Sequence, residues 1–310
     1  MSSATSASAI PSSLAPAIPS APARPLPASL RGVLWMGGVV VSLSVMAIAI
    51  RQLTPHMGSF EILFLRTLVS LAIVLALLTR CGFGALRTRH AGLHLFRNVL
   101  HFGGQYAWVY TIAVLPLATV ASIEFTMPVW AAVLAMLFLG ERLNRGRAVM
   151  LALGLAGTLV ILRPGVGIIH PAALVMLLGS VAYAGSVIAT KRLAQRDSAL
   201  AILFYMSLIQ TLLGLAPALA HWVAPQPADV PWILAIGVGS LTTHYSLTRA
   251  FRLADASLVV PIDFIRLPLI AVVGALVYRE AIDPTIMLGA AMIFAGTYYS
   301  IRRESRARSA

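Results

Sequence analysis

Long apolar runs, separated by short stretches that contain proline, glycine or charge, recur along this chain. Each run is about 20 residues long, which is the length a helix needs to cross the ~30 Å hydrocarbon core of a bilayer. The pattern predicts an all-α integral membrane protein with ten transmembrane helices. Their expected ranges are 32–50, 59–79, 93–113, 117–139, 147–163, 171–190, 198–222, 231–250, 257–278 and 284–301.

Polar and proline-rich segments flank the apolar runs at both ends of the chain. Residues 1–30 consist mainly of serine, alanine and proline. Proline disfavours a helix and low hydrophobicity disfavours a core, so the sequence predicts a disordered cytoplasmic tail rather than a targeting segment. Residues 303–310 are expected to form a short basic cytoplasmic tail.

Composition supports a lipid environment. Hydrophobic residues make up 59% of the chain and charged residues only 11%, whereas soluble domains carry roughly 25% charged residues. The net charge of +13 could suggest nucleic-acid binding, but the position of the arginines explains it differently. The chain has one cysteine, so an intrachain disulfide and a cysteine-based metal cluster are both excluded.

The basic residues predict an orientation. If the N-terminus is cytoplasmic, only Arg51, Arg163 and Arg279 fall on the opposite side, and Arg66 and Arg266 fall within helices. This bias follows the positive-inside rule and predicts cytoplasmic termini and an even number of spans in the cell inner membrane. The cytoplasmic group is Arg24, Arg31, Arg80, Arg87, Arg89, Arg97, Arg142, Arg145, Arg147, Lys191, Arg192, Arg196, Arg249, Arg252, Arg302, Arg303, Arg306 and Arg308.

An internal repeat divides the chain into halves, 31–163 and 164–302. Residues 115–163 align without a gap with 254–302, and the identical pairs include Phe125 with Phe264 and Glu141 with Glu280. Because each half would hold five helices, an odd number, consecutive halves must lie in the membrane with opposite orientations. The result is an inverted repeat, an arrangement common in secondary transporters. A duplicated scaffold without transport is the alternative.

Residues 115–163 resemble a known family signature. Met127-Pro128 lies in mid-helix and Phe138-Leu139-Gly140-Glu141-Arg142 follows at the helix end, as in EamA-type transporters of the drug/metabolite transporter superfamily. The second copy, with Pro268 and Tyr278-Arg279-Glu280, is similar. The resemblance covers about residues 32–302. It implies a ten-helix bundle with a central cavity and a bacterial exporter or permease for amino acids, metallophores, drugs, vitamins or nucleoside metabolites.

Four charged residues are expected at membrane depth, where each costs about 2.5–3.5 kcal/mol. Glu124 and Asp263 are equivalent in the repeat and are expected to face each other, while Asp263 and Arg266 are spaced for an i, i+3 pair. Pro128 would free the carbonyl of Glu124, and Pro128 and Pro268 are the predicted helix kinks. We expect the two acids to bind an amine or a proton, and Arg266 or Arg66 to bind a carboxylate. Internal ion pairs that only hold helices together are the alternative.

Polar and aromatic side chains in two helices complete the predicted site. His101, Gln105 and Trp108 lie on one helical face, and Gln105-Tyr106 and His244-Tyr245 occupy equivalent repeat positions. Polar groups are costly in lipid, so these residues are expected to line an interior pocket for a small organic substrate. The full predicted substrate-binding set is Glu124, Asp263, Arg266, His101, Gln105, Tyr106, Trp108, His244, Tyr245 and Arg66.

Motifs for enzymatic chemistry do not occur in the sequence: it has no phosphate-binding loop, His-Glu-x-x-His motif or Gly-x-Ser-x-Gly turn. The prediction is a non-enzymatic secondary transporter without cofactor or metal, with the lipid bilayer, a small molecule and a coupling proton as partners and no nucleic acid. Export is the expected direction. An uptake permease of the same fold, or a membrane enzyme or scaffold, is the alternative.

Overall fold

A computed structural model of the chain describes residues 27–139, 143–163, 170–254 and 256–309, and this part is helical without strands. Residues 1–26 of the predicted tail 1–30, and Glu141, lie outside the described residues, whereas residues 28–30 belong to the first helix rather than to a disordered tail. The helices are α1 (Ala28–Leu53), α2 (Ser59–Cys81), α3 (Ala91–Val114), α4 (Leu117–Glu124), α5 (Met127–Leu139), α6 (Arg145–Leu162), α7 (Pro171–Ala194), α8 (Ala199–Ala220), α9 (Val230–Leu253), α10 (Ala256–Asp263), α11 (Arg266–Tyr278) and α12 (Pro284–Ser309), with short 3₁₀ turns η1 (Phe83–Leu86) and η2 (Pro227–Asp229).

Two of the predicted helices are each broken into two. The expected helix 117–139 ends at Glu124 and restarts at Met127, and the expected helix 257–278 ends at Asp263 and restarts at Arg266. Proline cannot donate the helical hydrogen bond to the residue four positions earlier, and Pro128 and Pro268 follow the two breaks. The predicted kinks are therefore complete interruptions. At the C-terminus, α12 continues to Ser309, so the predicted basic tail is helical through residue 309.

Eight spans in the described residues are long and apolar enough to cross a membrane, and two of them are the broken pairs α4–α5 and α10–α11. The two other long helices, α3 and α9, have 24 residues each and are absent from this set. These are the helices that contain Gln105, His101 and His244. Their polar side chains lower the hydropathy of helices that are otherwise long enough to span.

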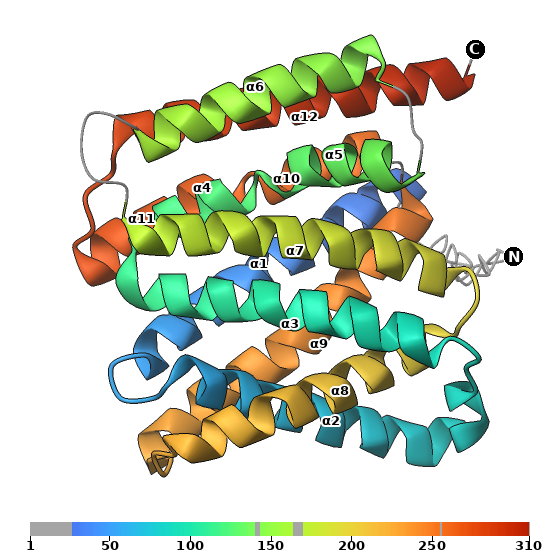
Figure 1. The fold of residues 1–310 in the computed structure, drawn as a ribbon, viewed down its shortest axis with the longest axis vertical. Helices are drawn as coiled ribbons and strands as arrows, with labels where there is room; N and C mark the ends of the chain where they lie inside the picture. Colours follow the sequence, from blue (N-terminus) through green and yellow to red (C-terminus); the bar gives the residue numbers. More distant parts are fainter. Residues whose placement is uncertain (1–26, 140–142, 164–169, 255, 310) are drawn as a thin grey trace, which may run out of the picture.

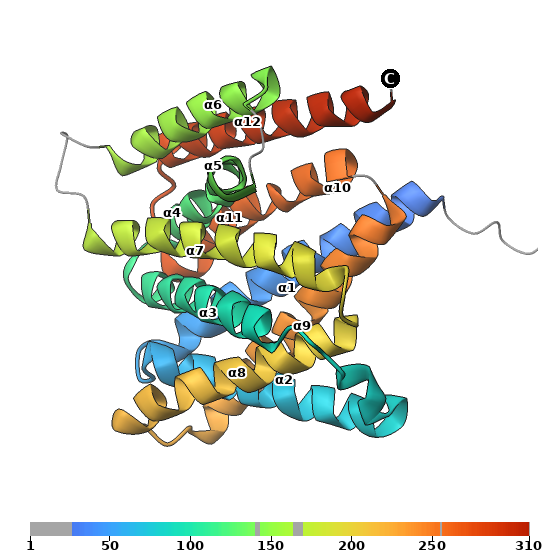
Figure 2. The same cartoon turned by 45° about the vertical axis from the view of Figure 1, so that its right-hand side comes forward.

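The helices pack in pairs that combine the two halves of the chain. α1 packs along α9, α3 along α7, α2 along α8, and α6 along α12. The α6–α12 and α2–α8 pairs form the outer layers, and the other pairs and the broken helices lie between them (Figures 1 and 2). α1 begins and α12 ends on the same side of the bundle (Figure 1). The broken helices pack against α1 and α7, which places them inside the bundle.

The outer helices α6 and α12 approach each other closely where Gly157 faces Gly289. A Cβ atom on Gly157 would lie 2.5 Å from the carbonyl oxygen of Gly289, and a Cβ atom on Gly289 would lie 2.6 Å from the carbonyl oxygen of Gly157. Only residues without a side chain permit this approach, which is the small-residue packing typical of helices in lipid. The crossing joins the last helix of one half to the last helix of the other.

Candidate functional site

The two helix breaks meet in the interior of the bundle. The rings of Phe125 and Phe264, which follow Glu124 and Asp263 in the chain, stack with centroids 4.4 Å apart. α4 packs against α11 across this contact. The two repeat-related segments that carry Glu124 and Asp263 therefore meet at the helix breaks.

Arg266 connects the two acids. Its Nη1 donates a hydrogen bond to Glu124 Oε2 at 2.9 Å, and its Nε lies 3.5 Å from Asp263 Oδ1. Arg266 is 3% exposed, and its guanidinium also lies over the Phe125 ring, 4.9 Å from the centroid. The predicted i, i+3 pair is present, and Glu124 adds a second carboxylate from the other half. With all three groups ionised, this triad has a net charge of −1.

Trp108 reaches the same region from α3. It lines a cavity of about 10 Å³ together with Arg266 and with Leu117 and Val120 of α4. A cavity of this size holds about one water molecule, whereas metabolite pockets measure about 300 Å³ or more. This cavity is therefore too small for a metabolite.

The rest of the predicted α3 face is also buried. The ring of His101 lies 5.8 Å from that of His244 and 5.5 Å from that of Tyr183, measured between centroids. Gln105 is buried, and its Oε1 has no hydrogen-bond partner among the described residues. A buried acceptor without a partner is costly.

Two predicted aromatic residues lie apart from this pair of histidines. Tyr106 stacks on Phe60 of α2, with centroids 4.5 Å apart. Tyr245 is 52% exposed and packs edge-on against Trp35 of α1. The repeat predicts that the two tyrosines occupy equivalent positions, but each packs against a different neighbouring helix: Tyr106 against α2 and Tyr245 against α1.

Arg66 and Arg97 are both buried, and the position of Arg97 corrects an expectation. The sequence analysis counted Arg97 with the cytoplasmic basic residues, although the expected helix 93–113 contains it; it lies within α3 and is 3% exposed. Its i, i+4 relation to His101 places it on the polar face of that helix, which is the signal that could have identified it. Arg66 bonds to Gln210 of α8, a polar residue that the sequence reasoning missed.

The end of the bundle opposite the termini is held by Arg51. Its guanidinium pairs with Glu280 and also donates to the carbonyl of Leu115, at 2.7 Å. Glu280 Oε2 in turn accepts from the backbone N–H of Leu117 at 2.9 Å. Glu280 therefore joins α1, the start of α4 and the end of α11 at one point.

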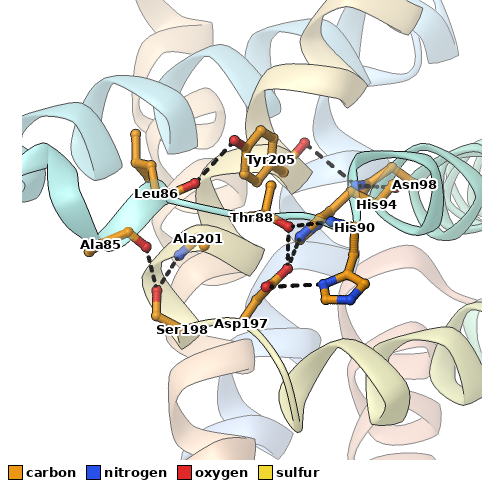
Figure 3. Close-up of polar contacts among 10 residues, drawn as sticks. All are labelled: Ala85, Leu86, Thr88, His90, His94, Asn98, Asp197, Ser198, Ala201 and Tyr205. Carbon is orange, nitrogen blue, oxygen red and sulfur yellow. Dashed lines mark hydrogen bonds and ion pairs between the residues drawn. The ribbon is translucent and has the colours of Figure 1, made fainter.

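Asp197 organises a corner at the side where the termini lie. Its carboxylate accepts from Thr88 and contacts His94 Nε2, each at 2.7 Å, and His90 lies 3.5 Å away (Figure 3). Burial alone would raise the pKa of Asp197, but the hydrogen bonds from Thr88, His94 and His90 outweigh it and hold that pKa below its ordinary value. The corner ties the loop after α7 to the start of α3.

Comparison with known proteins reveals a family match over both halves. The EamA-like transporter family matches residues 30–163 and again residues 170–302. A solved crystal structure superposes with a TM-score of 0.64 over 89% of this chain and 98% of its own, at 17% identity, which supports the fold alone.

Curated relatives cover nearly the same span. An S-adenosylmethionine uptake transporter of Rickettsia prowazekii is 26% identical over 280 residues, which is 90% of this chain and 95% of that protein. A riboflavin transporter of Rhizobium johnstonii is 31% identical over 89% of this chain and 92% of its own length. A pseudopaline exporter of Pseudomonas aeruginosa is 29% identical over 81% of this chain and 88% of its own length.

Proposed function

Because the chain belongs to the EamA-like transporter family, we propose that it is a secondary transporter that moves a small polar or amphipathic metabolite across the bacterial cytoplasmic membrane by alternating access. The observation that carries this proposal is the triad of Glu124, Asp263 and Arg266 at two facing helix breaks. Discontinuous helices that place charged groups inside the bundle are typical of transporter binding sites. The acids of the triad would bind an amine or a coupling proton.

The proposed architecture has ten spans in two inverted halves. The packing pattern supports it, because α1 packs on α9 as α7 packs on α3, and each of these pairs takes one helix from each half. In the same way, α2 packs on its counterpart α8 and α6 on its counterpart α12. This pattern is what a two-fold axis within the membrane plane would produce. Movement of one half against the other would then open the pocket to each side in turn.

The orientation proposal can be tested by cysteine labelling. The single cysteine, Cys81, is first replaced by serine. In that background we expect a membrane-impermeant maleimide to label Ala224→Cys in intact cells, and to label Arg31→Cys and Arg306→Cys only after permeabilisation. The basic residues favour this result because they gather on the side of the termini. Labelling of Arg31→Cys and Arg306→Cys from opposite sides would contradict the inverted arrangement.

Uptake is the direction we propose, since several relatives are named as S-adenosylmethionine uptake transporters. Export, which the sequence analysis expected, is the second candidate, and the named pseudopaline exporter supports it. Accumulation of radiolabelled S-adenosylmethionine and riboflavin in intact cells with and without the gene separates the two: uptake raises accumulation and export lowers it.

Counterflow in liposomes tests transport itself. Vesicles containing the purified protein are loaded with unlabelled S-adenosylmethionine, riboflavin or an amino-acid mixture, and the labelled compound is added outside. We expect transient accumulation of at least one label above that in protein-free vesicles, because a carrier exchanges its substrate without net flux. No counterflow of any compound would favour a membrane enzyme or scaffold.

A further inference from the structure

Two buried arginines lack a carboxylate partner among the described residues. Arg66 is 2% exposed and Arg97 is 3% exposed. The described acids that form ion pairs do so elsewhere: Glu124 and Asp263 pair with Arg266, Glu280 with Arg51, Asp283 with Arg163, Asp197 with His90 and His94, and Asp229 with His56. The bundle therefore encloses two positive charges that no described side chain neutralises.

Both guanidinium groups belong to one hydrogen-bond network of neutral side chains. Arg66 Nη2 donates to Gln210 Oε1 at 2.9 Å, and Arg97 Nη1 donates to Asn98 Oδ1 at 2.8 Å. Gln210 Nε2 then joins the two arms, because it lies 3.2 Å from Asn98 Oδ1 and 2.9 Å from His101 Nδ1. Arg66 of α2 therefore contacts the Gln210 amide of α8 directly, and Arg97 of α3 is linked to it through Asn98.

Neutral partners at the edges complete the network without balancing its charge. Arg66 Nη1 donates to Ser240 of α9 at 3.1 Å, and Arg97 Nε donates to Thr190 of α7 at 3.0 Å. Hydroxyl and amide oxygens satisfy N–H donors, but they do not remove the cost of burying an ion. The Nε of Arg66 has no hydrogen-bond partner among the described residues. Five helices therefore contribute to a positively charged cluster, here called the arginine cluster, in which the Nε–H of Arg66 is a donor without a described partner.

A carboxylate would balance positive charge in the arginine cluster and accept from its free donor. The planar guanidinium presents its donors in a fork that matches the two oxygens of a carboxylate, and such pairs are short and strong. His101 belongs to the network and lies beside Tyr183 and His244, so the arginine cluster lies next to the predicted site residue His244. We propose that Arg66 and Arg97 together bind a carboxylate group of the transported substrate. This inference rests on the proposed transport function.

Acetate and its neutral analogue acetamide test carboxylate binding by the arginine cluster without knowledge of the substrate. The thermal midpoint of the detergent-solubilised full chain is measured with sodium acetate substituted for sodium chloride, and separately with acetamide at the same concentration and constant ionic strength. We expect acetate to raise the midpoint and acetamide to leave it unchanged, because a ligand that binds only the folded state stabilises it.

Variants assign the effect to the two arginines. Arg66→Gln and Arg97→Gln should each lose the acetate shift, whereas Arg80→Gln, at the exposed end of α2, should retain it. If a glutamine variant fails to fold, Arg66→Lys and Arg97→Lys replace it, and these should show a weaker shift because lysine keeps the charge but not the fork. An acetate shift no larger than the acetamide shift, or one retained by the variants of both arginines, would overturn the proposal.

The counterflow assay separates this inference from the proposed function. An acetate shift that depends on Arg66 and Arg97, without counterflow of any compound, would keep the carboxylate site and reject transport. Counterflow without an acetate shift would keep transport and reject the carboxylate site.

Discussion

Replacing Glu124 by glutamine is expected to reduce counterflow by about 10- to 100-fold while the protein stays folded. The loss follows from removal of a charged acceptor, since a hydrogen bond to a charged group contributes about 1.5–3 kcal/mol and each 1.4 kcal/mol is a factor of ten in binding. Asp263→Asn is expected to behave in the same way, because Asp263 contacts the same Arg266 guanidinium. The measurement is the initial rate of counterflow at a fixed amount of reconstituted protein.

The charge of the triad explains why folding should survive. Two carboxylates and one guanidinium give −1, so removal of either acid leaves a neutral pair around Arg266. Gel-filtration profile and thermal midpoint should therefore match those of the wild type. Asp283→Asn is the matched control, because it removes an acid whose partner, Arg163, lies at a loop end; its counterflow should stay near the wild-type rate. Normal counterflow by both Glu124→Gln and Asp263→Asn would rule out the acids as substrate ligands.

The helix positions could largely be predicted from the sequence, because lipid imposes a minimum apolar length on each span. The expected ranges agree with most observed helices to within a few residues. The exceptions are 117–139 and 257–278, where one helix was predicted and two are found, and 284–301, because α12 continues to Ser309. A hydropathy profile records only how many apolar residues follow one another. A break in the helix does not change that number, so the profile cannot detect it. Pro128 and Pro268 predicted a kink, but their sequence positions do not determine whether the helix bends or stops.

The composition of the site was only partly predictable. Spacing along one helix identified the Asp263–Arg266 contact, since i and i+3 lie on the same face. The contact between Glu124 and Arg266 joins α4 to α11 and depends on how the halves pack. Gln210 was missed for the same reason, because a single amide in an apolar helix has no partner that local spacing could reveal.

Arg97 illustrates a different limit. Counting basic residues by side placed it in the cytoplasmic group, although the expected range 93–113 contains it, and it lies near the start of α3, on the side of the termini (Figure 1). Burial depends on the neighbouring helices, however, and α7 covers Arg97 through the bond to Thr190. The same charge can therefore satisfy the positive-inside rule and still face the interior.

Replacing Arg266 by glutamine is expected to be far more damaging to the fold than removal of either acid. The variant leaves two carboxylates in the interior, with a net charge of −2 at the helix breaks and no described cation within ion-pair distance of either acid. Removal of one partner from a buried ion pair costs about 3–5 kcal/mol, because the remaining charge is left without compensation. We expect a thermal midpoint well below that of the wild type, measured on detergent-solubilised protein. Arg163→Gln, which removes the 40% exposed partner of Asp283, should shift the midpoint little, since exposed pairs contribute about 0–1 kcal/mol.

A second substitution distinguishes loss of charge balance from loss of packing. Arg266 also lies over the Phe125 ring, so a cavity left by the shorter glutamine side chain could lower stability by itself. Adding Glu124→Gln to Arg266→Gln reduces the unbalanced charge from −2 to −1 without restoring any volume. If charge dominates, the double variant is more stable than Arg266→Gln alone. Glu124→Gln gives no such gain in the wild-type background. The difference between these two effects measures the coupling between Glu124 and Arg266. A double variant as unstable as Arg266→Gln would instead assign the effect to packing around Phe125, and the triad would then be a minor contributor to the fold.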